Sequence, residues 1–428
     1  MSTWHSNPNK IILFDNGAYE IKHSTVNSVS FNKFQNAKFF EKTSNSSLAS
    51  SAPFFIKDIK DFPLENISNL SRNYLRPLSR GLLNDIDLQL DIWEKIFNMY
   101  YSMEHGDETF KENCLIFTHT PFAPDEIIEG FFEIIFEYFN FDACFKTIPH
   151  VFTSIYNKNI NNKNKVNNIV QLIVDSGFSS TTIVPIFENF PVFNAIKRVE
   201  IGGKLLTNFL KESLINITDI DIRKEFYLIN LMKEENCFVS KNFLKDMNLS
   251  KIPINNENNN IFNNNSIITN SIFTKRFILP EFRKNIEKNN KKIDKFSIPI
   301  NNLRFVVPEI LFNPNMIGIE EGGIQEGIIQ SINDCHEDYK NLLFQNIICN
   351  GGNSKFDNFK ERLSFELNNC IDHDFVKNVK VDCVGKNDEN VVEGMKIFGK
   401  NIDYLKDVAI TKKEYDEIGF NIVWKSCY

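Results

Sequence analysis

The chain has 428 residues, of which 42% are hydrophobic and 24% are charged, and it carries a formal net charge of -7 at pH 7. That length and apolar content suffice for two or more packed domains. The mild acidity argues against strong direct binding to nucleic acid, because a protein that contacts many phosphates needs a basic surface.

The cysteines and the N-terminus indicate the compartment. The eight cysteines stand alone, without a Cys-x-x-Cys or a His–Cys cluster, which is typical of buried thiols in a reducing compartment. The N-terminus lacks the apolar core of a signal peptide, and no apolar run reaches the roughly 18 residues of a membrane helix. We therefore expect a soluble protein of the nucleus or the cytoplasm that does not bind membranes.

An apolar run near the N-terminus leads directly into Asp-Asn-Gly. Ile11–Gly17 predicts a buried strand that ends in a tight turn, where backbone N–H groups can cradle a phosphate. Asp15 at the strand end can hold a metal ion, directly or through water. Lys22 follows at a spacing that can bring its ammonium group back to a phosphate.

The following segments predict alternating loops, helices and strands. Leu48–Pro53 and its polar approach predict an exposed loop, and Leu90–Tyr101 has helical spacing. Cys114–Thr118 predicts a strand, and Asp125–Glu137 predicts a helix with one polar stripe of glutamates. The Asn/Lys-rich stretch Ile155–Asn168 predicts a loop.

The strand-to-glycine motif recurs at Leu172–Gly177, where an apolar run again ends in Asp-x-Gly. Asp175 and Gly177 repeat the first aspartate and glycine, and Ser176 adds a hydroxyl between them. Either motif alone is most often an ordinary turn. Two copies at distant places suggest instead a duplicated domain that grips one nucleotide from both sides.

Three later features could complete such a site. Gly202 and Gly203 precede a predicted helix and allow close approach to a sugar or phosphate. Lys233 and Glu234 lie on a helical segment, where such a pair is by itself most often solvated. Asn346–Asn353 is a looser third copy of the motif. The alternation of strands and helices predicts α/β layers with a ligand in the crevice at the strand ends.

Two polar stretches interrupt the later part of the chain. Asn255–Asn265 is a near-continuous asparagine tract, and Lys284–Lys295 is rich in lysine and asparagine. Both predict surface insertions without a role in the site.

Together these segments resemble the actin fold family over nearly the whole chain. Phe14–Gly17 resembles the first phosphate loop of that family, and Val174–Gly177 resembles the second. Gly202–Thr207 resembles the segment that lines the nucleotide from the other domain. Lys233–Ser240 resembles the Lys-Glu step beside the ribose and adenine, and Asn350–Ser354 resembles the adenosine loop.

The resemblance implies an α/β, actin-like fold of two duplicated domains, with four subdomains around a central nucleotide cleft. Residues 1–166 with 391–428 would form the first domain, and 167–390 the second, with a smaller subdomain at about 202–306. The implied cofactor is ATP or ADP with magnesium, and Asp15 and Asp175 would hold the magnesium through water. The implied nucleotide-binding residues are Asp15, Asn16, Gly17, Ala18, Lys22, Asp175, Ser176, Gly177, Gly202, Gly203, Lys233, Glu234, Gly351, Gly352, Asn353 and Phe356.

Several residues depart from what the family needs for hydrolysis. Actin positions its attacking water with a Gln and a His, but Pro149 or a neighbour stands where the Gln is expected, and Thr182 replaces the His. Phe178 replaces an acidic residue of the second loop, and Tyr19 replaces a glycine of the first and would crowd the phosphates. Because phosphoryl transfer depends on water positioning and charge stabilisation, we expect no catalytic residues and little or no ATPase activity.

Within the family, several stretches most resemble a nuclear subfamily of actin-related proteins. Asp15–Tyr19, Ile201–Asn208 and Val307–Pro314 carry this resemblance. It implies a subunit of a Swr-type chromatin remodeller, which places a variant histone into nucleosomes with ATP hydrolysed by a separate motor subunit. The implied partners are the remodeller subunits, including the motor ATPase, and indirectly the variant histone and nucleosomes. The implied location is the nucleus, and also the cytoplasm.

Two other functions stay open. One is an active ATPase or kinase of the wider actin superfamily, although no Asp or Glu stands out as the base that a kinase needs. The other is a cytoskeletal actin-related protein. Against it, the region of actin's long polymer-contact loop is compressed here into a polar segment near Ser44–Pro53. We therefore expect a monomer outside its complex.

Overall fold

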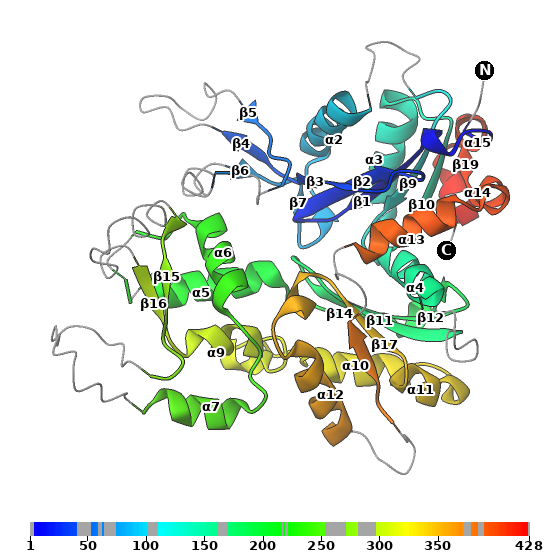
Figure 1. Ribbon diagram of the computed structural model, residues 1–428. Coiled ribbons are helices and arrows are strands. Elements are labelled where there is room, and N and C mark those ends of the chain that lie inside the picture. Colours follow the sequence, from blue (N-terminus) through cyan, green and yellow to red (C-terminus); the bar gives the residue numbers. More distant parts are fainter. Residues whose placement is uncertain are drawn as a thin grey trace.

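The computed structural model describes residues 4–40, 53–58, 62–63, 74–101, 110–160, 169–215, 217–218, 221–252, 271–280, 297–370, 378–383 and 389–426. Two large mixed sheets with helices packed around them form its two halves, one above the other in Figure 1. Predicted segments 48–52, 255–265 and 284–295 lie outside the described residues. Within the described part, no helix is long and apolar enough to cross a membrane.

The first half is built on a six-stranded sheet with the order β19-β10-β9-β1-β2-β3. Its central strand, β1, is buried throughout, as the apolar run predicts, because helices cover the sheet on both sides. β1 pairs antiparallel with β2 and parallel with β9. The strands are β1 (Ile11–Asn16), β2 (Glu20–Thr25), β3 (Asn32–Gln35), β9 (Cys114–Thr118), β10 (Ala143–Thr147) and β19 (Ile410–Thr411).

The second half repeats this pairing scheme. Its sheet has the order β13-β12-β11-β17-β18, with β14 also paired to β12. β11 pairs antiparallel with β12 and parallel with β17, as β1 does with β2 and β9. The strands are β11 (Val170–Ser176), β12 (Thr181–Phe187), β13 (Phe190–Pro191), β14 (Lys197–Val199), β17 (Ile347–Asn350) and β18 (Val381–Cys383).

The helices of the first half follow the predicted segments with two differences. α2 begins at Ile86, earlier than predicted, because the Asp85 side chain accepts a hydrogen bond from the backbone N–H of Leu88 and caps the helix. The predicted helix from Asp125 changes from α to π geometry at Glu133. The helices are α2 (Ile86–Tyr100), α3 (Asp125–Phe132), η5 (Glu133–Tyr138), α4 (Pro149–Ile160), α13 (Asn390–Gly399), α14 (Ile402–Val408) and α15 (Lys412–Ile418).

The prediction of a loop at Ile155–Asn168 is wrong for its first part, because α4 continues to Ile160. Val151 and Phe152 of α4 are buried, and packing against α13 stabilises a helix that the polar composition does not favour. The two helices approach closely at Gly394, where an added Cβ would lie 1.9 Å from the carbonyl oxygen of Phe152. Residues 161–168 lie outside the described part.

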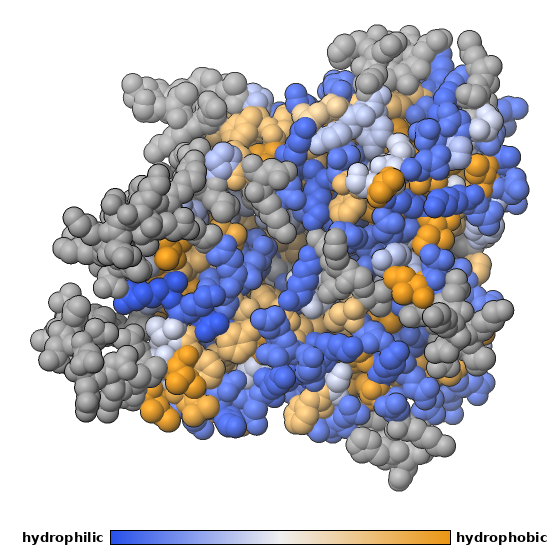
Figure 2. Space-filling view, in the orientation of Figure 1, coloured by the Kyte–Doolittle hydropathy of each residue, from blue (hydrophilic) through white to orange (hydrophobic). Residues whose placement is uncertain are grey.

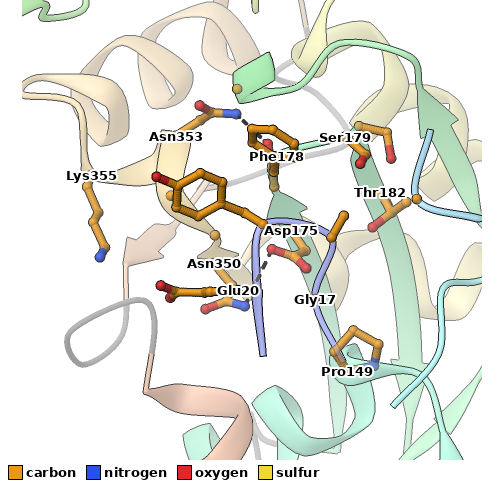
Figure 3. A pocket seen from close by; sticks show the side chains of 18 of the residues that line it. Gly17, Glu20, Pro149, Asp175, Phe178, Ser179, Thr182, Asn350, Asn353 and Lys355 are labelled. Atoms are coloured by element: carbon orange, nitrogen blue, oxygen red, sulfur yellow. Dashed lines mark hydrogen bonds between the residues drawn. The ribbon is translucent and has the colours of Figure 1, made fainter. Parts of the chain in front are cut away.

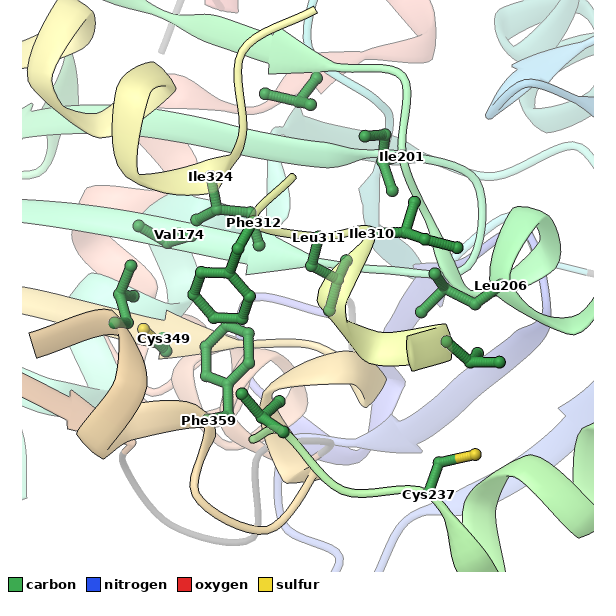
Figure 4. Packing of buried hydrophobic residues seen from close by; sticks show 14 of the residues in the cluster. Val174, Ile201, Leu206, Cys237, Ile310, Leu311, Phe312, Ile324, Cys349 and Phe359 are labelled. Carbon is green, nitrogen blue, oxygen red and sulfur yellow. The ribbon is translucent and has the colours of Figure 1, made fainter. Parts of the chain in front are cut away.

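The helices of the second half pack around the largest apolar cluster of the described chain. Figure 4 shows Val174 and Cys349 of the sheet beside Phe312 and Phe359, whose ring centroids lie 5.9 Å apart. The helices are α5 (Gly203–Ile215), α6 (Phe226–Asn236), α7 (Phe243–Ser250), α9 (Leu303–Glu309), α10 (Ile324–Asn333), α11 (Glu337–Phe344) and α12 (Phe359–Cys370), with the hairpin of β15 (Lys275–Ile278) and β16 (Ser297–Ile300).

A small sheet extends from the first half toward α6 (Figure 1). Its middle strand, β4, carries the buried Phe39, and a short hairpin of β7 and β8 follows it. Hydrophilic residues cover much of the described surface seen in Figure 2, and most of the apolar side chains are buried inside the two halves. The short strands are β4 (Lys38–Phe40), β5 (Pro53–Phe54), β6 (Tyr74–Leu75), β7 (Leu78–Ser79) and β8 (Leu82–Leu83).

Candidate functional site

A pocket of about 550 Å³ lies between the two halves, at the strand ends where the sequence predicts it. This volume falls in the usual range for small-molecule sites. All the predicted nucleotide-binding residues except Ser176 and Gly202 line it, although contact with a nucleotide stays a prediction for every one. Those that line it are Asp15, Asn16, Gly17, Ala18, Lys22, Asp175, Gly177, Gly203, Lys233, Glu234, Gly351, Gly352, Asn353 and Phe356.

The first loop is held by the strands beside it. Thr118, at the end of β9, donates to Oδ1 of Asp15 at 2.8 Å and accepts from the backbone N–H of Asn16 at 3.1 Å. Lys22 lies directly across the β1–β2 pair, and its Nζ is 3.3 Å from Oδ2 of Asp15. Strand register therefore brings the predicted lysine to the predicted aspartate.

The next residues of that loop form a tight turn. The backbone N–H of Gly17 donates to the carbonyl of Asp15 at 3.0 Å, and the side chain of Asn36 donates to the carbonyl of Gly17 at 3.0 Å. An added Cβ on Gly17 would lie 2.6 Å from the carbonyl oxygen of Glu20, so this turn has room only for glycine. Ala18 follows at the pocket wall.

Asp175 faces the same pocket from the end of β11 (Figure 3). Burial, and secondarily the nearby Asp15 carboxylate, raise its pKa to about 6, while Lys22 opposes the shift. The side-chain amide of Asn350 lies 3.5 Å from Oδ1 of Asp175. The pocket therefore concentrates negative charge between two carboxylates.

These two carboxylates suit a magnesium ion that keeps most of its bound waters. Among the described residues, no group of three or more His, Cys, Asp or Glu side chains converges as a metal site. Asp15 and Asp175 alone fit magnesium, because this ion commonly keeps several waters and binds through one or two carboxylates together with substrate phosphates. Burial and then the Asp15 charge raise the pKa of Asp175, and a cation would offset both effects by stabilising the ionised carboxylate.

Ser176 does not face the pocket. Its side chain is buried and lies 2.9 Å from Oγ1 of Thr181, and it accepts from Nδ2 of Asn353 at 3.2 Å. Asn353 also donates to the carbonyl of Gly177 at 2.9 Å. Because strand residues alternate between faces, Ser176 points away from the pocket side of Asp175 and fastens the second loop to the third.

Gly202 likewise supports the pocket without lining it. An added Cβ would lie 2.5 Å from the carbonyl oxygen of Phe178, so glycine lets the start of α5 press against the second loop. The next residue, Gly203, lines the pocket and donates its backbone N–H to the carbonyl of Gly177 at 2.9 Å. The predicted glycine pair thus divides into a packing residue and a lining residue.

Lys233 is buried, although a Lys-Glu pair such as Lys233 and Glu234 is by itself most often solvated. Lys233 lies on α6, and its Nζ donates to the carbonyl of Gly203 at 3.0 Å and to Oγ1 of Thr207 at 2.9 Å. Burial lowers its pKa to about 8. Glu234 is exposed at the pocket and accepts from the side chain of Asn230 at 2.7 Å.

The third loop completes the wall opposite the first. β17 runs parallel to β11 with Asn350 beside Asp175, so the glycines that follow reach the same edge. Gly351 has φ +89°, and an added Cβ would lie 2.3 Å from the carbonyl oxygen of Ser176. Gly352 and Phe356 line the pocket at either end of η9 (Gly352–Lys355).

Pro149 and Thr182 both line the pocket, where the sequence comparison with actin expects a Gln and a His (Figure 3). His150, next to Pro149, is buried with its Nε2 2.8 Å from Oγ1 of Thr182. Burial lowers the pKa of His150 to about 3, so this imidazole is neutral at physiological pH. Neither Pro149 nor Thr182 offers the carboxamide or imidazole that positions a water in actin.

Sequence reasoning missed Thr118 and Arg76, and it placed Asn350 in the third loop without assigning it a role in the site. Thr118 and Asn350 end strands that run parallel to the two aspartate strands, and polar residues at such ends were a usable signal. Arg76, whose guanidinium reaches the backbone of the first loop, gave no such signal. It follows β6 without belonging to a motif, and only the fold brings it to the first loop, beside the pocket.

Comparisons with known proteins agree with this architecture. Residues 61–428 match the family model described as Actin. An actin-related protein 6 from Arabidopsis thaliana is 29% identical over 386 residues, with 85% of this chain and 88% of that protein covered. An actin-like protein from Caenorhabditis elegans is 30% identical over 428 residues, with 97% and 92% covered.

A third relative, the actin-like protein ARP6 of Saccharomyces cerevisiae, is 28% identical over 456 residues, with 95% of each chain covered. The name actin-related protein 6 thus recurs from plants to yeast, in line with the resemblance that the sequence carries. The two mixed sheets, repeated pairing scheme and pocket described above accompany the family match. This chain therefore belongs to the actin family, has the actin-like α/β fold that its sequence predicts, and is an actin-related protein.

Proposed function

We propose that this protein is a non-catalytic, nuclear subunit of a Swr-type chromatin-remodelling complex, where its actin fold serves as an assembly platform. The relatives named actin-related protein 6 support the assignment to this subfamily. The partners would be the other remodeller subunits, including the motor ATPase that hydrolyses ATP. The variant histone and the nucleosome would be reached through those subunits.

One observation carries the non-catalytic part of the proposal. The pocket keeps groups suited to hold a nucleotide, but Pro149, Thr182 and Phe178 stand where water positioning and charge would be required. These side chains cannot orient an attacking water as an amide and an imidazole do. Binding without turnover is the function that this combination favours.

The bound cofactor would be ATP or ADP with magnesium, in a structural role. The backbone N–H groups of the two Asp-x-Gly loops would hold the phosphates, and Asp15 and Asp175 would hold the magnesium through water. Glu234, Gly352 and Phe356 line the pocket where the resemblance places the ribose and adenine. When bound, the cofactor supplies negative charge and contacts to both halves.

Steady-state hydrolysis tests the absence of catalysis. We expect purified full-length protein to release phosphate from ATP at the background rate, both as wild type and as Asp175→Ala. Asp403→Ala is a matched control, because the Asp403 side chain is 98% exposed and remote from the pocket. Steady turnover that disappears in Asp175→Ala but persists in Asp403→Ala would establish an active ATPase instead.

Affinity purification tests the assembly role. The tagged full chain, isolated from nuclear extract of its own organism, is expected to bring down a remodeller motor ATPase and histones in stoichiometric amounts. Recovery of filament or dynactin components without a remodeller would instead support a cytoskeletal actin-related protein. Extraction of any bound nucleotide before reassembly then tests its structural role, since melting and assembly unchanged by extraction would contradict that role.

A further inference from the structure

Arg76 joins the first loop to the second half of the molecule. Its Nη1 lies 3.0 Å from the carbonyl oxygen of Ala18 and 2.9 Å from that of Tyr19, at the turn of the first loop. Its Nη2 donates to the phenol oxygen of Tyr227 on α6 at 2.6 Å. One guanidinium therefore bonds to both halves beside the pocket, which a planar fork of donors allows.

Aromatic rings from both halves surround the same guanidinium. Its central carbon lies 4.9 Å from the ring centroid of Tyr19 and 5.1 Å from that of Phe178. The rings of Tyr19 and Phe178, one from each Asp-x-Gly loop, are themselves 5.0 Å apart. These distances fit cation–π and aromatic pairing, so the two loops are tied to each other by side chains as well as through Arg76.

Apolar packing continues behind this cluster. Phe39 of β4 and Tyr74 of β6 have ring centroids 5.6 Å and 5.4 Å from that of Tyr227. Tyr227 is only 1% exposed, and the buried Phe39 belongs to the same apolar cluster as the core of the second half. The small sheet of the first half therefore packs directly on α6, beside the pocket.

One further side chain, Asn230, adds to the same contact, and the Tyr227 phenol stays neutral. The side chain of Asn230 on α6 lies 3.4 Å from the hydroxyl of Tyr19. Burial raises the pKa of Tyr227 to about 12, so its phenol stays neutral and keeps its hydroxyl at physiological pH. The contact thus does not depend on a group that titrates near neutrality.

We propose that Arg76, Tyr19, Phe178 and Tyr227 form a cross-cleft clasp that holds the two halves closed without a nucleotide. In a cleft protein whose ligand touches both halves, the ligand can supply the bridge between them. Here the protein's own side chains supply it, and Arg76 is the positioning residue because its guanidinium bonds both to the backbone of the first loop and to Tyr227 on α6. The closed state does not rest on the proposed chromatin role.

If the pocket holds a nucleotide as proposed, the clasp also controls how fast that nucleotide enters and leaves. Because Tyr19 and Phe178 belong to the two loops predicted to hold phosphates, a nucleotide would enter or leave only when the clasp opens. Loosening the clasp should therefore accelerate both association and release. The bound state itself would change less, since the clasp closes again around the ligand.

Small-angle scattering and hydrogen exchange on the full chain test the clasp. Nucleotide is first removed with apyrase and EDTA, and ADP with magnesium is then added back. Wild type is expected to keep the same radius of gyration in both states. Arg76→Ala is expected to have a larger radius without nucleotide and amide exchange about tenfold faster at the start of α6, because local opening exposes these amides.

Three variants keep this test decisive. Arg76→Lys keeps the charge but loses the planar fork, so it should restore closure only partly. Arg223→Ala is the matched control, because the Arg223 side chain is 72% exposed and pairs locally with Asp221, and it should behave as wild type. Tyr227→Phe removes only the hydroxyl that Arg76 bonds to, so amide hydrogen exchange at the start of α6 should rise severalfold. This milder variant tests the clasp if Arg76→Ala does not fold.

Two results would overturn the clasp. The first is expansion of the wild type when nucleotide is removed, which would show that the ligand is the bridge. The second is exchange on α6 that is identical in wild type, Arg76→Ala and Tyr227→Phe. Neither result bears on the remodeller assignment, which affinity purification tests separately, so the two proposals fail independently.

Discussion

Asp15 and Asp175 place two carboxylates in one pocket, and of the two only Asp15 forms an ion pair within the described part of the chain. Lys22 lies 3.3 Å from Asp15, and Thr118 donates to the same carboxylate. The amide of Asn350 lies 3.5 Å from Asp175, and burial together with Asp15 raises the pKa of Asp175 to about 6. At residue scale, the pocket is therefore arranged to accept positive charge beside Asp175.

This arrangement makes the stability of the metal-free protein depend on pH. A pKa of about 6 in the folded state, above the ordinary 3.8, means that folding favours protonated Asp175, so stability is lost as pH rises from about 4 to 6. Asp175→Asn cannot ionise and escapes this loss. We compare the free energy of unfolding of Asp175→Asn with that of wild type. We expect this difference to favour the variant by at most about 2 kcal/mol more at pH 7 than at pH 4.5.

Urea unfolding of both proteins in EDTA at the two pH values measures this difference. The comparison with Asp175→Asn cancels the titration of all other groups, which the two proteins share. A stability difference that is the same at both pH values, or that is larger at pH 4.5, would contradict the raised pKa. Added magnesium should narrow the gap at pH 7, because it stabilises the ionised carboxylate.

Gly351 and Gly352 differ although they are neighbours. Gly351 has φ +89° and no room for a Cβ beside the carbonyl of Ser176, whereas a Cβ on Gly352 would meet nothing within 4 Å. We expect Gly351→Ala to lower the free energy of unfolding by about 2 kcal/mol or more. Gly352→Ala, the matched control, should change it by less than about 0.5 kcal/mol. Chemical denaturation measures both, and equal effects would contradict the strain argument.

At the scale of elements, the second half is held together by a buried ion pair as well as by its apolar core. Arg362 of α12 meets Glu309 of α9 in a bidentate contact, with distances of 2.7 Å and 2.9 Å. The Glu309 side chain is fully buried and the Arg362 side chain is 6% exposed. The contact fixes how α12, which follows the third loop, lies against α9.

Removing Arg362 alone should lower the free energy of unfolding more than replacing both charged residues with apolar ones. Arg362→Met leaves a buried carboxylate without its cation and should lower the free energy of unfolding by about 3–5 kcal/mol. The double variant Arg362→Met with Glu309→Leu removes both charges and should be clearly more stable than the single variant. Urea unfolding of the two variants and wild type tests this. A double variant less stable than Arg362→Met would show that the pair acts through packing alone.

At the scale of the whole molecule, two similar halves close around one pocket, and direct contacts join them at its mouth. Besides the clasp, the side chain of Arg198 reaches the carbonyl oxygen of Arg80, from β14 to the β7–β8 turn. The pocket and these bridges belong to neither half alone.

The molecule as a whole is expected to remain a monomer. The segment that corresponds to actin's polymer-contact loop, near Ser44–Pro53, is short, and nearly all of it lies outside the described residues. Sedimentation velocity in magnesium and in 0.1 M salt should give one species near 49.8 kDa, the mass of one chain. Polymers that form on adding salt would overturn this expectation and favour the cytoskeletal alternative.

The parts of the site that the sequence predicts are local. Each Asp-x-Gly motif joins an apolar strand to a tight turn, and the strand register then carries Lys22 to Asp15 and Asn350 to Asp175. The loop prediction that failed depends on a distant neighbour, whereas the place of Ser176 outside the pocket lining follows from local strand geometry, and its contact with a nucleotide stays a prediction. Ile155–Ile160 is helical because α13 packs against it, and Ser176 faces inward because the pleat turns it away from Asp175.

By itself, the sequence determined the family and the α/β layers, and most of the site residues that it predicted do line the pocket. The family follows from a resemblance along nearly the whole chain, and the layers and loops follow from periodicity and short motifs, whose physics acts over a few residues. Only the tertiary structure decided that Lys233 is buried, that Gly202 serves packing, and that Arg76 bridges the halves. Arg76 and Tyr227 are 151 positions apart in the chain, and only folding brings such distant residues together.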